Sequence, residues 1–313
     1  MFTNNFDPVA FEIFSLSVRW YSLAYIFGII FGWLYCKKIL IKDDIIQKLF
    51  EDYISYLIIG IIIGGRLGYV IFYNFSYFLN NPIEIFMIWN GGMSFHGGLM
   101  GIIITTYLFS KKNKTDIFIF LDLVSIAAPI GILFGRISNF INGELVGKVT
   151  NSNWGVFFPD YDDKLRHPSQ LYEAFLEGII LFILMNLIFF NKNYKIGTCS
   201  FMFLILYGCF RITSEIFREP DIQIGYLFGY VSMGMFLSAI MILIGFLIYF
   251  KRNDEIKSQK IGEVQKVLKS TSVDCILNAA QNDFADMDQT IEIELSDKSI
   301  IPYNIRDKHY SSI

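Results

Sequence analysis

Residues 227–250, LFGYVSMGMFLSAIMILIGFLIYF, form the stretch that decides the fold, and Lys251 and Arg252 follow it directly. The stretch has no Asp, Glu, Lys or Arg along its whole length. A helix needs roughly 20 mainly apolar residues to cross the hydrocarbon core of a bilayer. The stretch therefore predicts a membrane-spanning helix with a basic end at Lys251.

The rest of the chain up to residue 250 has the same apolar character. Of its 313 residues, 54% are hydrophobic, and residues 1–250 hold 35 charged residues. That is about 14% charged, against roughly 25% in soluble domains. A soluble enzyme, a disordered chain and a secreted disulfide scaffold are therefore excluded. The net charge of −3 and the lack of a basic block give no reason to expect a nucleic-acid partner. The four cysteines show no CxxC or metal spacing and are interpreted as free thiols.

The apolar segments predict an all-α polytopic membrane protein with about seven transmembrane helices. The predicted spans are residues 17–36, 53–75, 94–110, 117–137, 172–190, 197–215 and 227–250. A cleaved signal peptide is not expected, because residues 1–16 hold no Lys or Arg. Glycines four residues apart predict close helix packing, at Gly28/Gly32, Gly64/Gly68, Gly97/Gly101, Gly131/Gly135 and Gly225/Gly229.

The distribution of Lys and Arg predicts the orientation, since cytoplasmic loops are enriched in both. Basic residues occupy the loops after the first, third and fifth spans, and Lys251 and Arg252 follow the last. We therefore expect the N-terminus outside and the C-terminus inside. The predicted domains are a transmembrane catalytic domain, residues 1–250, and a polar cytoplasmic extension, residues 251–313. The extension is expected to be flexible or weakly folded.

In this orientation the polar residues of the spans gather at the outer boundary of the membrane. Ionisable groups within a bilayer are costly and usually functional. The gathered residues include Arg19, Tyr21, Arg66, His96, Arg136, Asn139, Asn142, Glu144, Gln170, Tyr172, Glu173, Glu177, Tyr207, Arg211, Glu215 and Arg218. Only Asp122 falls in an inner half. The pattern predicts a site at the outer boundary, whereas a transport path would line both halves.

One group of these residues shares a helix face. Tyr207, Arg211, Glu215 and Arg218 fall within roughly 80° of one another at 100° per residue. Glu215 can hold the guanidinium groups in place, and two arginines can bind a phosphate through bidentate hydrogen bonds. The alternative is that both arginines extend to lipid headgroups or the surface.

His96 lies in a second polar group, between Gly91-Gly92 and Gly97-Gly98. The glycines suggest a loop folded against protein, and the imidazole can act as a base or as a hydrogen-bond donor to phosphate. A structural role for His96 remains the alternative.

The third group runs from Arg136 through Asn139 and Glu144 to Gly147. Arg136 and Asn139 share a helix face, and the polar residues that follow suit a phosphodiester headgroup. A helix cap followed by a loop is the simpler interpretation.

These residues carry a resemblance to a known family. The stretches are RWY at 19–21, GRLGY at 65–69, YN at 73–74, GGMSFHGG at 91–98, GRISNFINGELVG at 135–147, HPSQLYE at 167–173, YGCFRITSE at 207–215 and FREPD at 217–221. Together they resemble the prolipoprotein diacylglyceryl transferases over all seven spans. The tail after about residue 255 lies outside the resemblance.

The resemblance implies an enzyme of the bacterial cytoplasmic membrane with its active site on the outer side. Its reaction moves a diacylglyceryl group from phosphatidylglycerol to the lipobox cysteine of a prolipoprotein, forms a thioether and releases glycerol phosphate. Its partners are thus phosphatidylglycerol, the lipobox segment and membrane lipid.

The resemblance also implies roles for single residues. Arg136 and Arg211 match essential arginines, and His96 is the candidate base. The expected binding or positioning residues are Tyr21, Arg66, Asn139, Glu144, Gly147, Tyr207, Glu215 and Arg218. No metal or cofactor is expected, because the arginines supply the charge. A lipid or anion transporter and a non-catalytic assembly protein remain the rival hypotheses.

Overall fold

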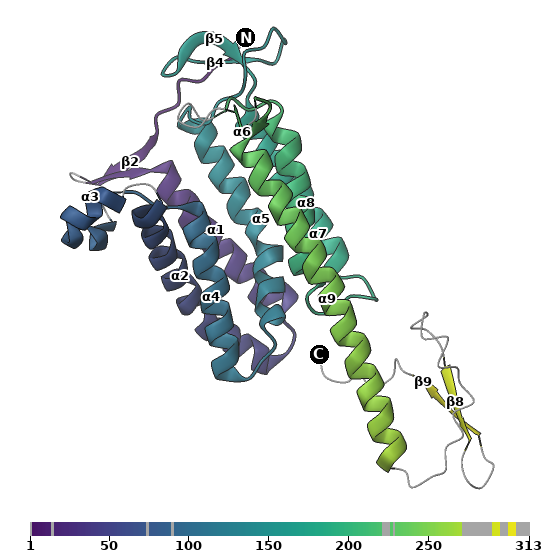
Figure 1. Ribbon diagram of the computed structural model, residues 1–313. Coiled ribbons are helices and arrows are strands. Elements are labelled where there is room, and N and C mark those ends of the chain that lie inside the picture. The colour runs from purple at the N-terminus through teal and green to yellow at the C-terminus, as the bar shows by residue number, and fades with distance from the viewer. Residues whose placement is uncertain are drawn as a thin grey trace. The chain divides into compact units, whose positions relative to one another are not determined.

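The computed structural model describes residues 2–13, 16–72, 75–88, 91–220, 226–227, 229–270, 290–294 and 300–304. The chain divides into two compact units, Met1–Phe246 and Leu247–Ile313. The first unit is a bundle of long helices with short strands at one end (Figure 1). The site described below lies entirely within this unit.

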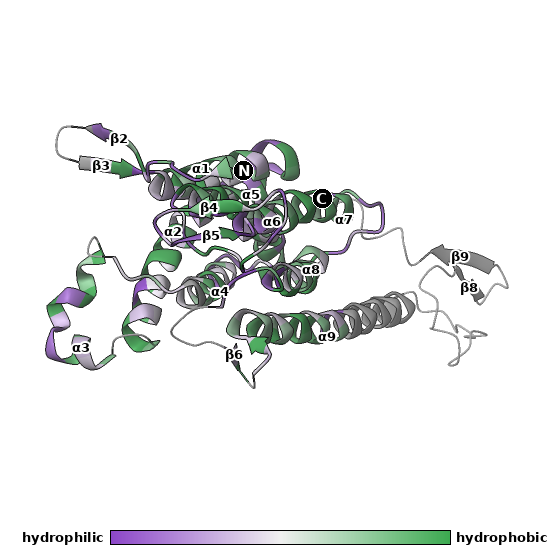
Figure 2. Cartoon of the chain, turned by 90° about the horizontal axis from the view of Figure 1, so that it is seen from above, coloured by the Kyte–Doolittle hydropathy of each residue, from purple (hydrophilic) through white to green (hydrophobic). Residues whose placement is uncertain are grey.

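The helices occupy most of the first unit. They are α1 (Trp20–Tyr35), the π-helix η1 (Cys36–Leu40), α2 (Asp44–Phe72), α3 (Phe75–Asn80), the 3-10 helix η2 (Pro82–Phe86), α4 (Phe95–Asn113), α5 (Ile117–Ile141), α6 (Ser169–Glu173), the π-helix η4 (Ala174–Ile180), α7 (Leu181–Phe189), α8 (Thr198–Glu215) and α9 (Met233–Ser270). Helices α6, η4 and α7 follow one another without a break. Figure 2 shows the helices of the bundle mainly in green, with hydrophilic segments around β5 and α6.

Five helical segments are long and apolar enough to cross a membrane: Trp20–Leu40, Asp44–Phe72, Ile117–Ile141, Ser169–Phe189 and Met233–Arg252. They agree with five of the seven predicted spans. The other two predicted spans coincide with α4 and α8, which are helical but more polar. The protein is therefore mostly helical and has several apolar helices of membrane-spanning length.

Glycines set the distance between α2 and α4. A Cβ on Gly68 would lie 2.6 Å from the Cα of Gly97, and one on Gly64 would lie 2.8 Å from the Cα of Gly101. Real Cβ atoms do not approach other atoms so closely, so the two helices pack backbone to backbone. The glycine pairs that the sequence singles out on these two helices thus meet each other.

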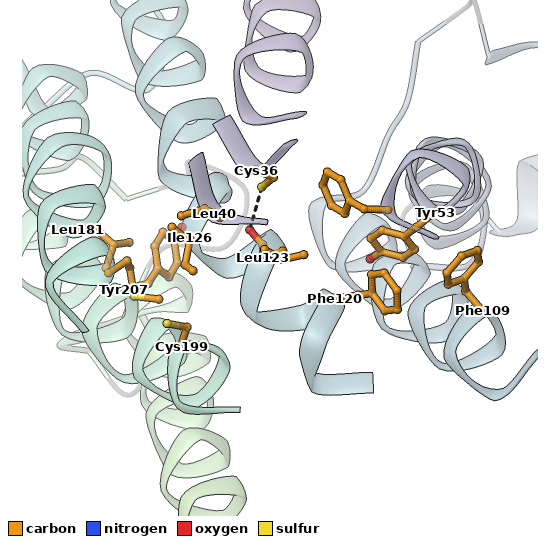
Figure 3. Packing of buried hydrophobic residues seen from close by; sticks show 12 residues of the cluster. Cys36, Leu40, Tyr53, Phe109, Phe120, Leu123, Ile126, Leu181, Cys199 and Tyr207 are labelled. Atoms are coloured by element: carbon orange, nitrogen blue, oxygen red, sulfur yellow. Dashed lines mark hydrogen bonds between the residues drawn. The ribbon is translucent and has the colours of Figure 1, made fainter. Parts of the chain in front are cut away.

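The core of the first unit is apolar and aromatic (Figure 3). Tyr53 packs against Phe109 and Phe120, with ring centroids 5.3 and 4.8 Å away. Its hydroxyl lies 2.6 Å from the hydroxyl of Thr106, so this buried polar group has a partner. The Cys36 thiol donates to the carbonyl of Leu123 at 3.6 Å.

Short strands cover the end of the bundle where α5 ends and α6 begins (Figure 1). One sheet has the order β1-β4-β5, in which β1 (Phe2–Thr3) is parallel and β5 (Asp162–Arg166) antiparallel to β4 (Val156–Phe158). Two hairpins are β2 (Val9–Ile13) with β3 (Leu16–Arg19), and β6 (Tyr226–Leu227) with β7 (Val231–Ser232). The all-α prediction omitted all of these strands.

The second unit contains the end of α9, which continues to Ser270, well past the predicted end of the last span at residue 250. It also contains an antiparallel hairpin of β8 (Thr290–Glu294) and β9 (Ile300–Asn304). The remaining residues of the predicted extension lie outside the described part of the chain. The helix and the hairpin add local structure that the prediction for residues 251–313 did not include.

Candidate active site

Six charged residues meet where α5 ends, α6 begins and α8 ends. We call them the arginine–glutamate cluster: Arg136, Glu173, Glu177, Arg211, Glu215 and Arg218. Arg136 lies in the last two turns of α5, and Glu173 and Glu177 lie one turn apart in α6 and η4. The three segments thus bring charges from distant parts of the sequence to one place.

Glu173 lies at the centre of the cluster. Its carboxylate is 2.9 Å from Nη1 of Arg136 and 3.3 Å from Nη1 of Arg218, and it also accepts a hydrogen bond from Nη1 of Arg211. Its side chain has no exposed surface. One buried carboxylate therefore fixes the positions of three guanidinium groups.

Glu177 and Glu215 complete the pairing of the two central arginines. Glu177 accepts a hydrogen bond from Nη2 of Arg136 at 3.1 Å, and its other oxygen lies 3.6 Å from Nη1 of Arg211. Glu215 lies 2.7 Å from Nη2 of Arg211, one helical turn away. The contact between Arg211 and Glu215 that the helix periodicity predicts is therefore confirmed.

The arginines of the cluster are slightly more exposed than its two central carboxylates. The side chains of Glu173 and Glu177 are fully buried, whereas those of Arg136 and Arg211 are 16% and 11% exposed. Arg218 is also buried, so the alternative of a surface arginine is wrong for this residue.

Two further residues close the cluster from the sides. The hydroxyl of Ser214 donates to Glu177 at 3.2 Å. Tyr207 is buried one turn before Arg211, stacks on Phe203 at 5.6 Å and lies within electrostatic range of Arg136. The predicted binding residue Tyr207 therefore forms part of the wall of the cluster.

Glu144 and Asn139 lie together in the loop after α5. The amide of Asn139 donates to the Glu144 carboxylate at 2.8 Å, and the amide of Asn142 does so at 3.3 Å. The side chain of Gln170, at the start of α6, donates to the Glu144 carbonyl at 2.7 Å. These bonds fix the loop that leads from Arg136 toward the residues around Glu173.

Gly147 is a crossing point of three chain segments. Its N–H donates to the carbonyl of His167 at 3.0 Å, and its carbonyl accepts from Arg166 at 2.8 Å. A Cβ at this position would lie 2.8 Å from the carbonyl oxygen of Phe217, so only glycine fits. A β-bridge joins Gly147 to Arg218, and through it the loop helps to position that arginine.

The strands beyond this crossing carry their own ion pair. Arg166 binds Asp162 through Nη2 at 2.7 Å and Nε at 3.0 Å, which lowers the pKa of the Asp162 carboxyl. His167 follows, with Nδ1 3.2 Å from the Tyr172 hydroxyl, and burial lowers its pKa. Burial therefore favours the neutral form of His167.

Arg66 binds backbone, not the cluster. Its guanidinium donates to the carbonyls of Glu84 at 2.6 Å, Ile85 at 3.0 Å, Met87 at 3.2 Å and Gly92 at 3.1 Å, and to that of Gly91. A guanidinium has five N–H donors, and five carbonyls receive them here. Arg66 therefore shapes the loop before α4, which favours a positioning role over direct headgroup binding.

Tyr21 has few contacts among the predicted residues that the structure describes. Tyr21 is partly exposed in the first turn of α1 and accepts a hydrogen bond from the Tyr25 hydroxyl at 3.1 Å. Tyr25 lies within electrostatic range of Glu144. The side chain of His96 lies outside the described residues. Its backbone lies in the first turn of α4, where the hydroxyl of Ser94 caps the helix through the N–H of Gly97 at 3.2 Å.

The prediction placed Glu173 and Glu177 among the polar residues at the outer boundary but gave neither a role in the site. Their spacing of four, which places them on one helix face, is a signal that they act together. Within the described residues, no group of three His, Cys, Asp or Glu side chains is arranged to hold a metal ion.

The helices and the cluster define a multi-pass membrane protein with paired arginines buried at one end of its bundle. The family model described as prolipoprotein diacylglyceryl transferase matches residues 8–251. The phosphatidylglycerol–prolipoprotein diacylglyceryl transferase of Rickettsia bellii (strain OSU 85-389) is 50% identical over 251 residues, which cover 79% of this chain and 95% of that protein.

Two further relatives carry the same name. The protein of Rickettsia africae (strain ESF-5) is 51% identical over 77% of this chain and 95% of its own length. That of Rickettsia typhi (strain ATCC VR-144 / Wilmington) is 48% identical over 82% of this chain and 100% of its own length. The chain belongs to the prolipoprotein diacylglyceryl transferase family.

Proposed function

We propose that the chain transfers the diacylglyceryl group of phosphatidylglycerol to the lipobox cysteine of prolipoproteins. The sulfur forms a bond to the carbon of the diacylated glycerol that carries the phosphate, and the bond between that carbon and the phosphate oxygen breaks. The electron pair leaves with glycerol phosphate, and the thiol proton passes to a base. The relatives' name supports the two substrates, and the arginine–glutamate cluster supports the chemistry.

The observation that carries the proposal is the pair of guanidinium groups of Arg136 and Arg211, both held by Glu173. Negative charge grows on the phosphate as the bond breaks. Fixed cations aimed at that charge lower the barrier, because they need no reorganisation during the reaction. Each guanidinium has five donors, so it can hold a carboxylate on one edge and a phosphate oxygen on another.

The cluster holds three arginines and three glutamates, so its formal charge is zero when all six are ionised. A phosphodiester that binds there adds one negative charge. We expect the phosphate to bind edges of Arg136 and Arg211 other than those that hold the carboxylates. Each buried guanidinium and each buried carboxylate then keeps a partner.

The other residues serve the same reaction in this proposal. Asn139 and Glu144 line the approach to Arg136, and Tyr21 and Tyr25 lie beside them. Arg66 and Gly147 position backbone segments. His96 is the proposed base or phosphate donor, since the thiol has a free pKa near 8.5 and a modest base suffices.

The proposal also includes the finer topology. Seven spans, an outer N-terminus and an inner C-terminus fit the positions of α1 to α9 and the Lys and Arg distribution. The site would then face the outer side of the bacterial cytoplasmic membrane, where a secreted prolipoprotein emerges.

The test uses the purified full chain in detergent with phosphatidylglycerol and a peptide that carries a lipobox cysteine. Mass spectrometry of the peptide should show the gain of one diacylglyceryl group. A peptide with Ser in place of that cysteine is the matched control and should not change. Failure to modify the cysteine peptide, with the protein folded and phosphatidylglycerol bound, would refute the transferase and favour transport.

A further inference from the structure

An open apolar groove with a volume of about 300 Å³ lies between α1, α5, η4 and α7, and several of its lining residues are exposed. We call it the α5–α7 groove. Its walls come from Phe31 on α1, from one face of residues 129–134 on α5 and from residues 178–183 on η4 and α7. All nine of its lining residues are apolar or glycine.

Local sequence features shape this groove. Gly178 has no side chain, and a Cβ there would lie 2.9 Å from the Cβ of Leu133, so η4 and α5 approach closely at the upper end. Phe31 and Phe134 stack at 5.8 Å and form one wall. Helix η4 is a π-helix, a rare conformation that often occurs at functional sites.

The groove is continuous with the cluster along both of its helices. Leu133 precedes Arg136 by three residues and Gly178 follows Glu177, and the Arg136–Glu177 pair closes at 3.1 Å. A helix rises 1.5 Å per residue, so Leu133 and Pro129 lie about 5 and 10 Å from Arg136 along the axis of α5. The groove covers this part of the helix. A ligand with its anionic group at the cluster would therefore place the adjoining apolar part in the α5–α7 groove.

We infer that the α5–α7 groove binds one acyl chain of the diacylglyceryl donor, and that its lower end limits the chain length accepted. This inference rests on the proposed function. A phosphate with an acyl chain attached through glycerol has the same order of polar and apolar parts as the cluster and the groove.

The test replaces Ile183, a lining residue of α7 at the lower end of the groove, with Trp. The full chain in detergent receives the lipobox peptide and an equimolar mixture of dioctanoyl-, dimyristoyl- and dioleoyl-phosphatidylglycerol. The masses of the peptide products give the chain-length ratio. This ratio is internal to one reaction and does not depend on how much of the variant folds.

Ile183→Trp should lower the ratio of dioleoyl to dioctanoyl product about tenfold, because even one methylene in an apolar pocket is worth roughly 10- to 200-fold in selectivity. Ile183→Ala should raise the same ratio. The matched control is Leu187→Trp, one turn further along α7, which is 65% exposed and does not line the groove. It should leave the ratio unchanged.

An unchanged ratio in both Ile183 variants, with transfer intact, would overturn the inference and assign the groove to surrounding membrane lipid. A higher KM for the peptide with an unchanged lipid ratio would assign it to the substrate's apolar segment and overturn the inference as well. If the unaltered chain transferred no lipid of any length, the proposed function itself would be refuted, and the acyl role with it.

Discussion

Helices α5 and α8 carry a buried polar cluster at each of their two ends, and the two clusters differ in kind. At the start of both helices, the carboxylate of Asp122 accepts four hydrogen bonds: from the Tyr194 hydroxyl at 2.5 Å, the Gly197 N–H at 2.6 Å, and the Ser200 N–H and hydroxyl at 2.7 and 2.5 Å. At the other end lies the arginine–glutamate cluster.

The difference separates a structural contact from the proposed site. The donors to Asp122 are all neutral, and three of them come from the first turn of α8 or the residue just before it, where N–H groups lack partners within the helix. The Asp122 carboxylate thus caps α8 and fastens it to α5. The arginine–glutamate cluster instead pairs charges of both signs from three segments, and the side chains of Arg136 and Arg211 stay 16% and 11% exposed. Burial of charge alone therefore does not distinguish the proposed site from a structural contact, whereas the kind of partner does.

The largest expected effect is on the two central arginines. Arg136→Lys and Arg211→Lys should each lower turnover by about 100- to 1,000-fold, because a point charge cannot replace a planar fork of donors aimed at developing charge. Turnover in the lipobox-peptide assay measures the loss. Arg19→Lys, at an exposed arginine just before α1, is the control. Near-normal turnover in either cluster variant would reject its proposed role.

Glu173→Gln tests whether one carboxylate positions three arginines. Removal of one partner from a buried ion pair costs about 3–5 kcal/mol, so both the unfolding temperature in detergent and turnover should fall. Glu219→Gln is the control, because Glu219 is 38% exposed and, among the described residues, forms an ion pair with one arginine, Arg166. If the two variants behaved alike, Glu173 would not be the centre of the cluster.

Gly234→Ala probes the cluster from α9. A Cβ there would lie 2.8 Å from the Glu215 carboxylate, which can move only by weakening its 2.7 Å contact with Arg211. A small displacement at a catalytic group can cost up to about 100-fold, so we expect a 10- to 100-fold loss of turnover with stability nearly intact. Gly135→Ala is the matched control, since a Cβ there meets open space. Equal activity of the two would show that Glu215 has no positioning role.

Asp122→Asn should lower stability and leave turnover nearly unchanged, the opposite of Gly234→Ala. The amide offers its own N–H groups to four donors, and unsatisfied buried donors cost about 1–3 kcal/mol, so the unfolding temperature should fall. Turnover per folded molecule should stay within about twofold, as for a residue far from the chemistry. A loss of turnover larger than that of Gly234→Ala would break the distinction between the two clusters.

The smallest expected effect is on the pH dependence of the unfolding temperature. Burial lowers the pKa of folded His167 below its unfolded value, near 6.5, so the unfolded chain binds more protons as the pH falls through this window. The stabilising effect of neutral His167 is complete above that pKa and is lost on acidification. Asp162, with its pKa lowered, loses its contribution only in stronger acid. The unfolding temperature should drop more between pH 7 and pH 5 in the parent than in His167→Gln; parallel curves would contradict this.

Local periodicity explains what the sequence could predict. The spans, the Arg211–Glu215 contact and the glycine faces of α2 and α4 follow from spacings within one or two turns. The charged residues of α5 and α8 could also be grouped at one end, because their depth follows from the start of each span.

The features of the fold and the cluster that the sequence did not predict depend on contacts between distant residues. Nothing within one turn of Arg136 indicates that its partners are Glu173 and Glu177, or that the carbonyls of residues 84–92 bind Arg66. The strands β1, β4 and β5 have two to five residues and are too short to show a period of two. Such strands are stabilised by pairing across the fold and leave little signal in the sequence.

The order of the cluster charges along the chain has a consequence for biogenesis. Arg136, Glu173 and Glu177 are synthesised first and sum to one negative charge, whereas Arg211, Glu215 and Arg218 follow and sum to one positive charge. Neither group is neutral alone, and an uncompensated charge in a bilayer is costly. The synthesis of α8 therefore completes the neutralisation of the cluster. A nascent chain that stops before Thr198 would keep one uncompensated negative charge among its apolar helices.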